Sequence, residues 1–139
     1  MMEALGVTAT PYMTLLALSV ILLVFQILLQ GMLATRELGS QWNAGPRDEG
    51  LEPKGRFAGR AARASKNFRE TYPAFVGLLL GVAFTGDDAS RWGLIGGWIW
   101  FVARIVYLPL YLAGIPYFRS FVWLISMMGL LAMTIALFR

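Results

Sequence analysis

The 139-residue sequence contains no cysteine and no histidine. The absence of cysteine excludes disulfides and any thiol nucleophile supplied by the chain itself. Together these two residue types provide most zinc and haem ligands, so the sequence predicts no site for these metals. Charged residues are scarce as well, at 14%, whereas soluble proteins have about a quarter. Because 58% of the residues are apolar and the mean hydropathy is +0.62, we expect a single domain whose solvent is mostly lipid.

The N-terminus lacks the basic segment that opens a secretory signal, since the only charged residue before the first apolar run is Glu3. That run, residues 12–29, is also longer than the apolar region of most signals. We therefore interpret it as a retained membrane span.

Four transmembrane helices are predicted within one domain, residues 1–139. A helix needs about 20 mostly apolar residues to cross the hydrocarbon core. The apolar block at residues 72–84 is too short, and reaches this length only if its helix begins near Arg56. The predicted spans are residues 10–33, 58–85, 91–113 and 117–138, with a polar loop over residues 36–57. The fold class is an all-α integral membrane protein, a four-transmembrane-helix bundle, because unpaired backbone is not tolerated in lipid.

The positive charges indicate how these spans are oriented. Eight of the twelve lysines and arginines lie between Arg36 and Arg69. By the positive-inside rule, residues 36–69 and the turn at residues 114–119 are predicted to be cytoplasmic. The acidic turn at Asp87 and Asp88 and both termini are then on the opposite side.

One face of the second predicted helix is polar. Its residues are spaced by four, three, four and three positions, which places them on a common face of a helix. This polar stripe consists of Arg56, Arg60, Arg63, Asn67 and Glu70. Small residues continue the same face. These are Ala74, Gly77 and Gly81, and small side chains allow another helix to approach closely. Gly77, Gly81, Gly93 and Gly97 are compatible with close packing between chains, but they do not indicate the number of chains.

The third predicted helix has a second polar face, formed by Arg104, Tyr107 and Tyr111. Arg104 lies inside an apolar run, where a charged side chain requires a partner or a water-filled cavity. Glu70 is the predicted partner. Two interpretations remain open: an ion pair that joins two helices, or a polar pocket whose guanidinium groups bind a small multi-carboxylate ligand.

Other large side chains outside these faces are interpreted as interfacial or lipid-facing. They are Trp92, Trp98, Trp123, Met127 and Met128.

The segment from Arg60 to Phe75 resembles the signature of the MAPEG family, the membrane-associated proteins in eicosanoid and glutathione metabolism. That signature reads Arg-Ala-x-x-Asn-x-x-Glu-x-x-Pro-x-Phe. It is matched by Arg63, Ala64, Asn67, Glu70, Pro73 and Phe75. Arg104 followed by Tyr107 and Tyr111 resembles the family's third-helix motif. The run Gly-Ile-Pro-Tyr-Phe-Arg at residues 114–119 is typical of the bacterial branch, which is similar to microsomal glutathione S-transferases.

The resemblance implies a homotrimer in the bacterial inner membrane, with active sites between neighbouring protomers and glutathione as cosubstrate. It also assigns roles to particular side chains by motif position. The implied glutathione-binding residues are Arg36, Arg63, Asn67, Glu70, Arg104, Tyr107 and Tyr111. Arg119 would be the catalytic residue, because an adjacent cation lowers a thiol's pKa and favours the nucleophilic thiolate.

Three features depart from the family patterns. They are the residues Ser65 and Thr71 and the spacing from Tyr111 to Arg119. Glutathione binding is therefore better supported than catalysis, and eicosanoid chemistry is not supported.

Two functions follow. The first is a transferase or peroxidase that acts on hydrophobic electrophiles from the bilayer. The second is a non-catalytic lipid-binding protein or scaffold, such as an accessory subunit of a membrane complex. A channel or transporter is disfavoured because inverted repeats and pore motifs are missing. Nucleic-acid binding is disfavoured because anionic lipid accounts for the basic run.

Overall fold

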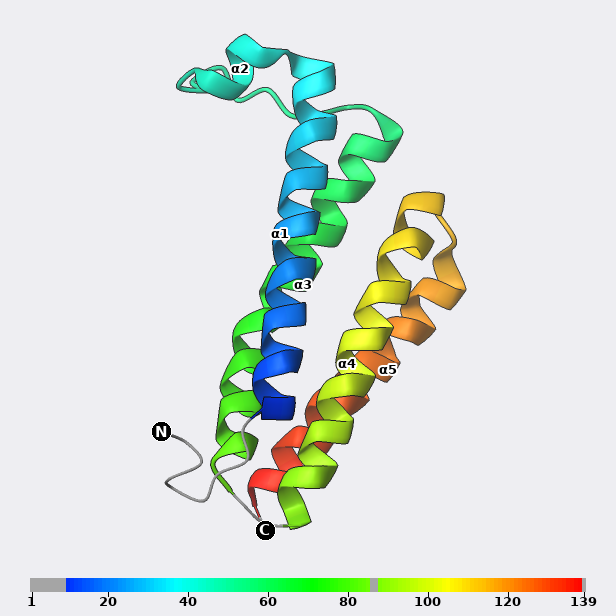
Figure 1. The fold of residues 1–139 in the computed structure, drawn as a ribbon. Coiled ribbons are helices and arrows are strands. Elements are labelled where there is room, and N and C mark those ends of the chain that lie inside the picture. Colours follow the sequence, from blue (N-terminus) through cyan, green and yellow to red (C-terminus); the bar gives the residue numbers. More distant parts are fainter. Residues whose placement is uncertain (1–9, 86–87, 139) are drawn as a thin grey trace.

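The computed structural model describes residues 10–85 and 88–138. Its helices are α1 (Thr10–Leu38), α2 (Ser40–Ala44), α3 (Arg56–Ala83), α4 (Asp88–Ala113) and α5 (Pro116–Leu137) (Figure 1). Glu3 and Asp87, which entered the predictions for the N-terminus and for the acidic turn, lie outside the described residues.

Within residues 10–85 and 88–138, three helices are long and apolar enough to cross a membrane: α1, α4 and α5. The segments concerned are Pro11–Leu38, Arg91–Ala113 and Pro116–Leu137. α3 is of similar length, but its first half contains the polar stripe and therefore lacks the apolar window of a typical span. The chain is thus an all-helical integral membrane protein in which the least apolar of the long helices is α3.

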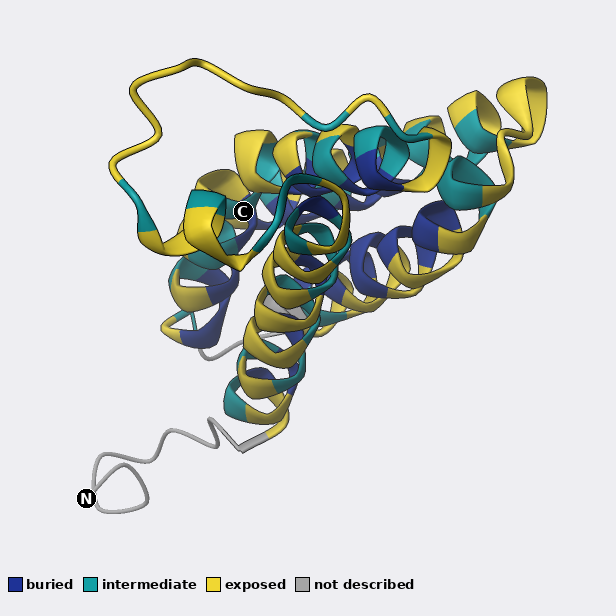
Figure 2. Ribbon diagram, turned by 90° about the horizontal axis from the view of Figure 1, so that it is seen from above, coloured by how far each residue is buried: buried dark blue, intermediate teal, exposed yellow. Residues whose placement is uncertain are grey.

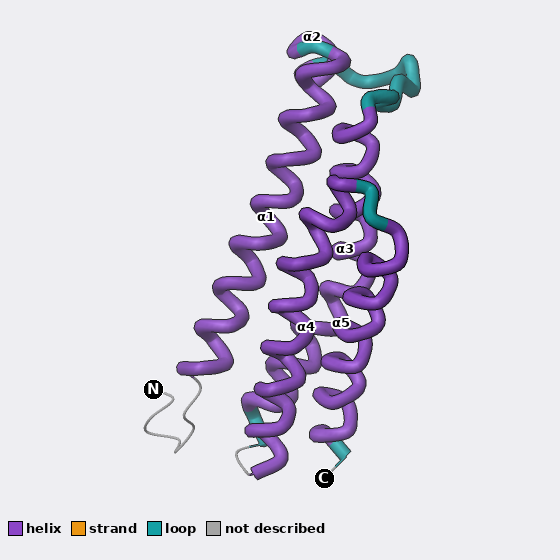
Figure 3. Tube along the Cα trace, turned by 90° about the vertical axis from the view of Figure 1, so that its right-hand side faces the viewer, coloured by secondary structure: helices purple, strands orange, loops and turns teal. Residues whose placement is uncertain are grey.

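α3 has the central position among the long helices. It packs against α1 on one side and against α4 and α5 on the other, while α4 and α5 pack along each other (Figures 1 and 3). The start of α1 and the end of α5 lie at one end of the bundle, and α2 and the α4–α5 turn lie toward the other (Figure 1). The charged half of α3 is therefore supported by helices on both sides.

Aromatic side chains join α3 to α4 in the core. The rings of Phe75 and Trp100 stack with centroids 4.0 Å apart, and both side chains are fully buried. Tyr72 stacks on Phe75 and forms a hydrogen bond with Ser19 of α1, with a hydroxyl-to-hydroxyl distance of 2.9 Å. This bond links α1 to α3 inside an otherwise apolar region.

Glycines allow α4 and α5 to touch backbone to backbone. A Cβ built on Gly129 would lie 2.6 Å from the carbonyl oxygen of Gly96 and 2.8 Å from the nitrogen of Trp100. Real Cβ atoms do not approach backbone atoms this closely, so the crossing requires glycine at these positions.

We expect Gly129→Ala to destabilise the protein by about 1–3 kcal/mol, because α4 and α5 must separate to admit the methyl group. Thermal unfolding in detergent, followed by circular dichroism, measures the loss. Gly31→Ala is the matched control, since a Cβ there meets nothing within 4 Å. Equal unfolding midpoints for the two variants would contradict the close crossing.

Four glycines, Gly77, Gly81, Gly93 and Gly97, are compatible by sequence with contacts between chains. Three of them pack against side chains of the same chain. A Cβ on Gly93 would collide with Val82, and one on Gly81 would lie 3.1 Å from Leu137. Gly97 packs in the same way against Leu15. Only Gly77, of the four glycines named from the sequence, has open space beside it.

Many residues of the bundle are exposed (Figure 2), and the exposed side chains include many large apolar ones. On α1 the exposed side chains include Ile21, Phe25 and Leu28. In a membrane protein such a surface contacts lipid or another protein.

Candidate functional site

A polar cleft of about 310 Å³ lies between α3, α4 and α5. This volume is at the lower end of the range for small-molecule sites, about 300–1,000 Å³. The lining residues are Arg63, Asn67, Tyr107, Tyr111, Arg119, Ser120 and Trp123. Five of these seven were predicted as site residues, so the fold brings together side chains from three helices.

α3 contributes Arg63 and Asn67, which are four residues apart and so lie on one face. A Cβ on Gly59 would lie 3.1 Å from Nη1 of Arg63, so the guanidinium group lies beside this glycine. The Asn67 Oδ1 atom is buried and has no hydrogen-bond partner among the described residues. It is an acceptor available to a ligand.

Tyr107 and Tyr111 of α4 form the opposite wall. Their rings meet edge to face, with centroids 5.6 Å apart. The guanidinium carbon of Arg119 lies 4.5 Å from the centroid of the Tyr111 ring, which is a cation–π contact. Arg119 at the start of α5 and Arg63 on α3 therefore give the cleft two guanidinium groups.

Arg104 lies outside the lining of the cleft and is only 1% exposed. Its guanidinium carbon is 4.5 Å from the centroid of the Tyr107 ring and 5.5 Å from that of Phe68. None of its three side-chain nitrogens has a hydrogen-bond partner within residues 10–85 and 88–138. A buried guanidinium group in this state is energetically costly.

The predicted pairing of Arg104 with Glu70 is wrong for the single chain. Glu70 is exposed, whereas Arg104 is buried against Phe68. Phe68 and Glu70 are two residues apart on α3 and so point to nearly opposite sides of the helix. The face of α3 that packs on α4 is the one that contains Phe68.

The remaining predicted site residues, Arg36 and Glu70, are exposed and do not line the cleft. Arg36 is in the last turn of α1. The adjacent Glu37 accepts hydrogen bonds from the backbone N–H groups of Lys54 and Gly55, which ties the end of α1 to the start of α3. Arg36 and Glu70 are thus placed where a neighbouring molecule could reach them.

The sequence did not identify two lining residues, Ser120 and Trp123. Trp123 was interpreted as an interfacial or lipid-facing side chain, yet its indole Nε1 is buried and has no hydrogen-bond partner in the described part of the chain. It follows Arg119 by four residues and shares its face, so helical spacing could have indicated it.

The donors and acceptors of the cleft fit a peptide-like acid. Arg63 and Arg119 match carboxylate or thiolate groups, and Asn67 and Trp123 offer an unpaired acceptor and an unpaired donor. Fold and cleft together define a helical membrane protein with a polar cleft that contains two guanidinium groups. A model of the MAPEG family matches residues 15–139, and the chain belongs to that family. No curated protein and no solved structure matches the chain.

Proposed function

We propose that the protein is a glutathione-dependent transferase or peroxidase that acts on hydrophobic electrophiles from the bilayer. The observation that carries this proposal is the polar cleft, in which two guanidinium groups, an amide and two tyrosines converge. Family membership supports a function in glutathione or eicosanoid metabolism in general. The cationic cleft favours the tripeptide, which has two carboxylates and a thiol.

Some side chains of the cleft bind glutathione, and another activates its thiol. Arg63 and Asn67 bind the carboxylates and amides of glutathione, and Tyr107 adds a hydroxyl from α4. Arg119 holds the thiol as thiolate, because an opposite charge nearby lowers the pKa of the thiol. The proton leaves to water at the mouth of the cleft. In a transfer, the thiolate sulfur bonds to an electrophilic carbon that arrives laterally from lipid, and the displaced group leaves that carbon with the bonding electron pair. In a peroxide reduction, the thiolate attacks a peroxide oxygen, the O–O bond breaks to release an alcohol, and a second glutathione converts the sulfenic acid to a disulfide and water.

The homotrimer is proposed from the family resemblance, and exposed charges on α3 support association of the chain with further copies. The hydrogen bond from Arg60 to the carbonyl of Leu112 places Arg60 level with the end of α4. Glu70 follows ten residues later, which is about 15 Å further along the helix at about 1.5 Å per residue. Arg69 and Glu70 are exposed in the single chain at this depth, and charged side chains at such depth do not face lipid.

A second copy of the chain would cover this face, and the open space beside Gly77 would admit its helix. Neighbouring copies would also bring Arg36 and Glu70 to the cleft of an adjacent protomer. We place residues 36–69 and the α4–α5 turn on the cytoplasmic side of a bacterial inner membrane, where glutathione is available.

Calorimetric titration of the detergent-purified protein with reduced glutathione tests the proposal. We expect saturable binding that Asn67→Leu weakens at least tenfold, because the substitution removes a buried acceptor. Arg56→Met is the control, since Arg56 is an exposed cation of the same helix outside the cleft. Absence of binding at millimolar glutathione would refute the proposal.

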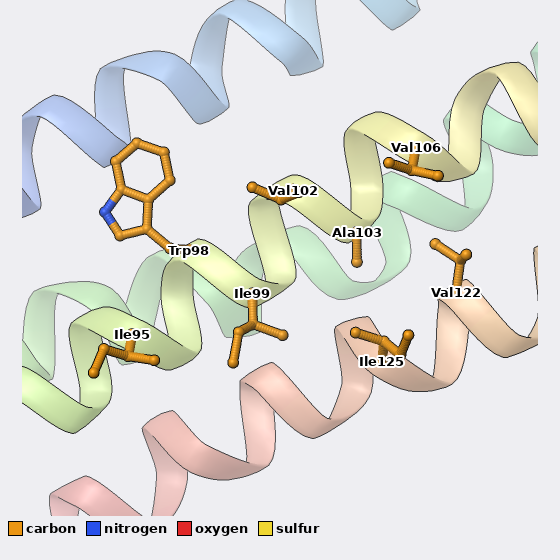
Figure 4. A pocket seen from close by; sticks show the side chains of 8 residues that line it. All are labelled: Ile95, Trp98, Ile99, Val102, Ala103, Val106, Val122 and Ile125. Atoms are coloured by element: carbon orange, nitrogen blue, oxygen red, sulfur yellow. The ribbon is translucent and has the colours of Figure 1, made fainter.

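A second candidate function is lipid binding without catalysis, and an apolar groove of about 530 Å³ favours it. The groove lies between α4 and α5 and shares no lining residue with the cleft. Figure 4 shows its side chains, which are Ile95, Trp98, Ile99, Val102, Ala103, Val106, Val122 and Ile125. Co-purified lipid in a protein that fails to bind glutathione would favour this function.

A further inference from the structure

The end of α4 is closed by a compact turn that leads directly into α5. The carbonyl of Leu110 accepts the N–H of Ile115 at 3.1 Å, and the carbonyl of Tyr111 accepts the N–H of Gly114 at 3.0 Å. Gly114 has a φ of 76°, a left-handed conformation that favours glycine. These features form a Schellman motif, which pairs two of the otherwise free carbonyls at a helix end.

The next carbonyl, that of Leu112, is paired by a side chain from another helix. Nη1 of Arg60 on α3 donates to this oxygen at 3.0 Å. The same guanidinium group fills the space beside Gly114, where a Cβ would lie 2.6 Å from its Nη2. A cation at a helix C-terminus also interacts favourably with the helix dipole. Arg60 therefore joins α3 to the α4–α5 turn.

The turn determines where Arg119 lies. α5 begins at Pro116, and Arg119 is in its first turn. The guanidinium group of Arg119 rests on the ring of Tyr111, in the last turn of α4. Arg63, on the other wall of the cleft, follows Arg60 by less than one turn of α3. The contact made by Arg60 thus links the two walls at the end of the cleft where Arg119 lies.

We propose that Arg60 is a positioning residue for thiol activation. It holds the α4–α5 turn against α3, so that Arg119 stays close to the sulfur of a ligand bound by Arg63 and Asn67. This inference rests on the proposed glutathione function. Arg60 itself does not line the cleft, so its effect on the thiol passes through the turn and Arg119.

The test compares Arg60→Met, which keeps the length of the side chain and removes its donors, with Arg56→Met on the same helix. Three quantities are measured: the glutathione Kd, the midpoint pH of the thiolate absorbance of bound glutathione, and the hydrogen exchange of the Gly114 and Ile115 amides. We expect Arg60→Met to raise the midpoint by about one pH unit, because a cation acts strongly only within about 4–6 Å. Exchange at both amides should become faster, while the Kd changes less than about threefold.

Gly114→Ala disturbs the same contact from the opposite side, since its methyl group displaces the Arg60 guanidinium group. It should reproduce the shift in midpoint, whereas Arg56→Met should not. An unchanged midpoint in Arg60→Met would overturn the inference, and so would a weaker Kd with an unchanged midpoint, which would make Arg60 a ligand contact. If the wild type forms no thiolate, the proposed function and the thiol role fail together. The exchange rates would still show whether Arg60 holds the turn.

Discussion

Arg119→Ala should raise the pKa of the bound glutathione thiol by about 1–3 units, since an opposite charge within about 4–6 Å lowers a pKa by that amount. At neutral pH the thiolate fraction falls accordingly, and conjugation of a model electrophile should slow by about 10- to 1,000-fold. Thiolate absorbance across a pH series and initial conjugation rates measure the two effects. The binding free energy that the thiolate contributes is lost as the pH falls through the lowered pKa of the bound thiol. The wild type should therefore bind glutathione more tightly above that pH than below it.

Binding of the tripeptide should largely survive Arg119→Ala, because Arg63 and Asn67 remain in the cleft. Arg119→Lys keeps the charge but loses the planar guanidinium group that rests on Tyr111, and an intermediate thiol pKa is expected. Arg91→Ala, an exposed arginine near the start of α4, is the control. A normal thiolate in Arg119→Ala would show that another group activates the thiol.

Arg104→Met should stabilise the ligand-free protein. The guanidinium group of Arg104 is 1% exposed, and its nitrogens have no hydrogen-bond partner in the described chain. Replacing buried charges with apolar side chains of similar size is often stabilising, by about 1–4 kcal/mol. Methionine has a similar length and adapts to irregular spaces. The unfolding midpoint in detergent should therefore rise.

Arg104→Lys is the companion variant, because it retains a buried charge and should bring no such gain. A lower midpoint for Arg104→Met would mean that Arg104 has partners in the assembled protein, such as buried waters or groups of another protomer. If the partners belong to another protomer, the substitution should also dissociate the proposed homotrimer, whereas loss of contacts with buried waters should not. Size-exclusion chromatography with light scattering distinguishes the two cases.

Periodicity within the sequence predicted which side chains share a face. The spacing of Arg63 and Asn67 on one helix, and of Tyr107 and Tyr111 on another, gave two of the walls that the structure brings together. The family resemblance added Arg119, on a third helix. Trp123 shared the face of Arg119, but composition alone grouped it with lipid-facing aromatics.

Periodicity does not show how a helix is rotated about its own axis relative to its neighbours. The predicted pairing of Arg104 with Glu70 failed for that reason. A helical repeat relates residues of one helix to each other, but it does not tell how that helix is turned toward its neighbours. Phe68 instead of Glu70 faces α4, so the two charges are kept apart. The same limit applies to Gly81, Gly93 and Gly97, whose partners proved to be in the same chain.

The sequence by itself determined that this is a helical membrane protein of the MAPEG family, because long apolar runs require paired backbone in lipid and the motif residues have fixed spacings. Tertiary structure decided which polar groups meet. The hydrogen bond from Arg60 to Leu112 and the cation–π contact of Arg119 with Tyr111 join residues of separate helices. Such contacts depend on how whole helices pack, and packing is set by the shapes of many side chains at once.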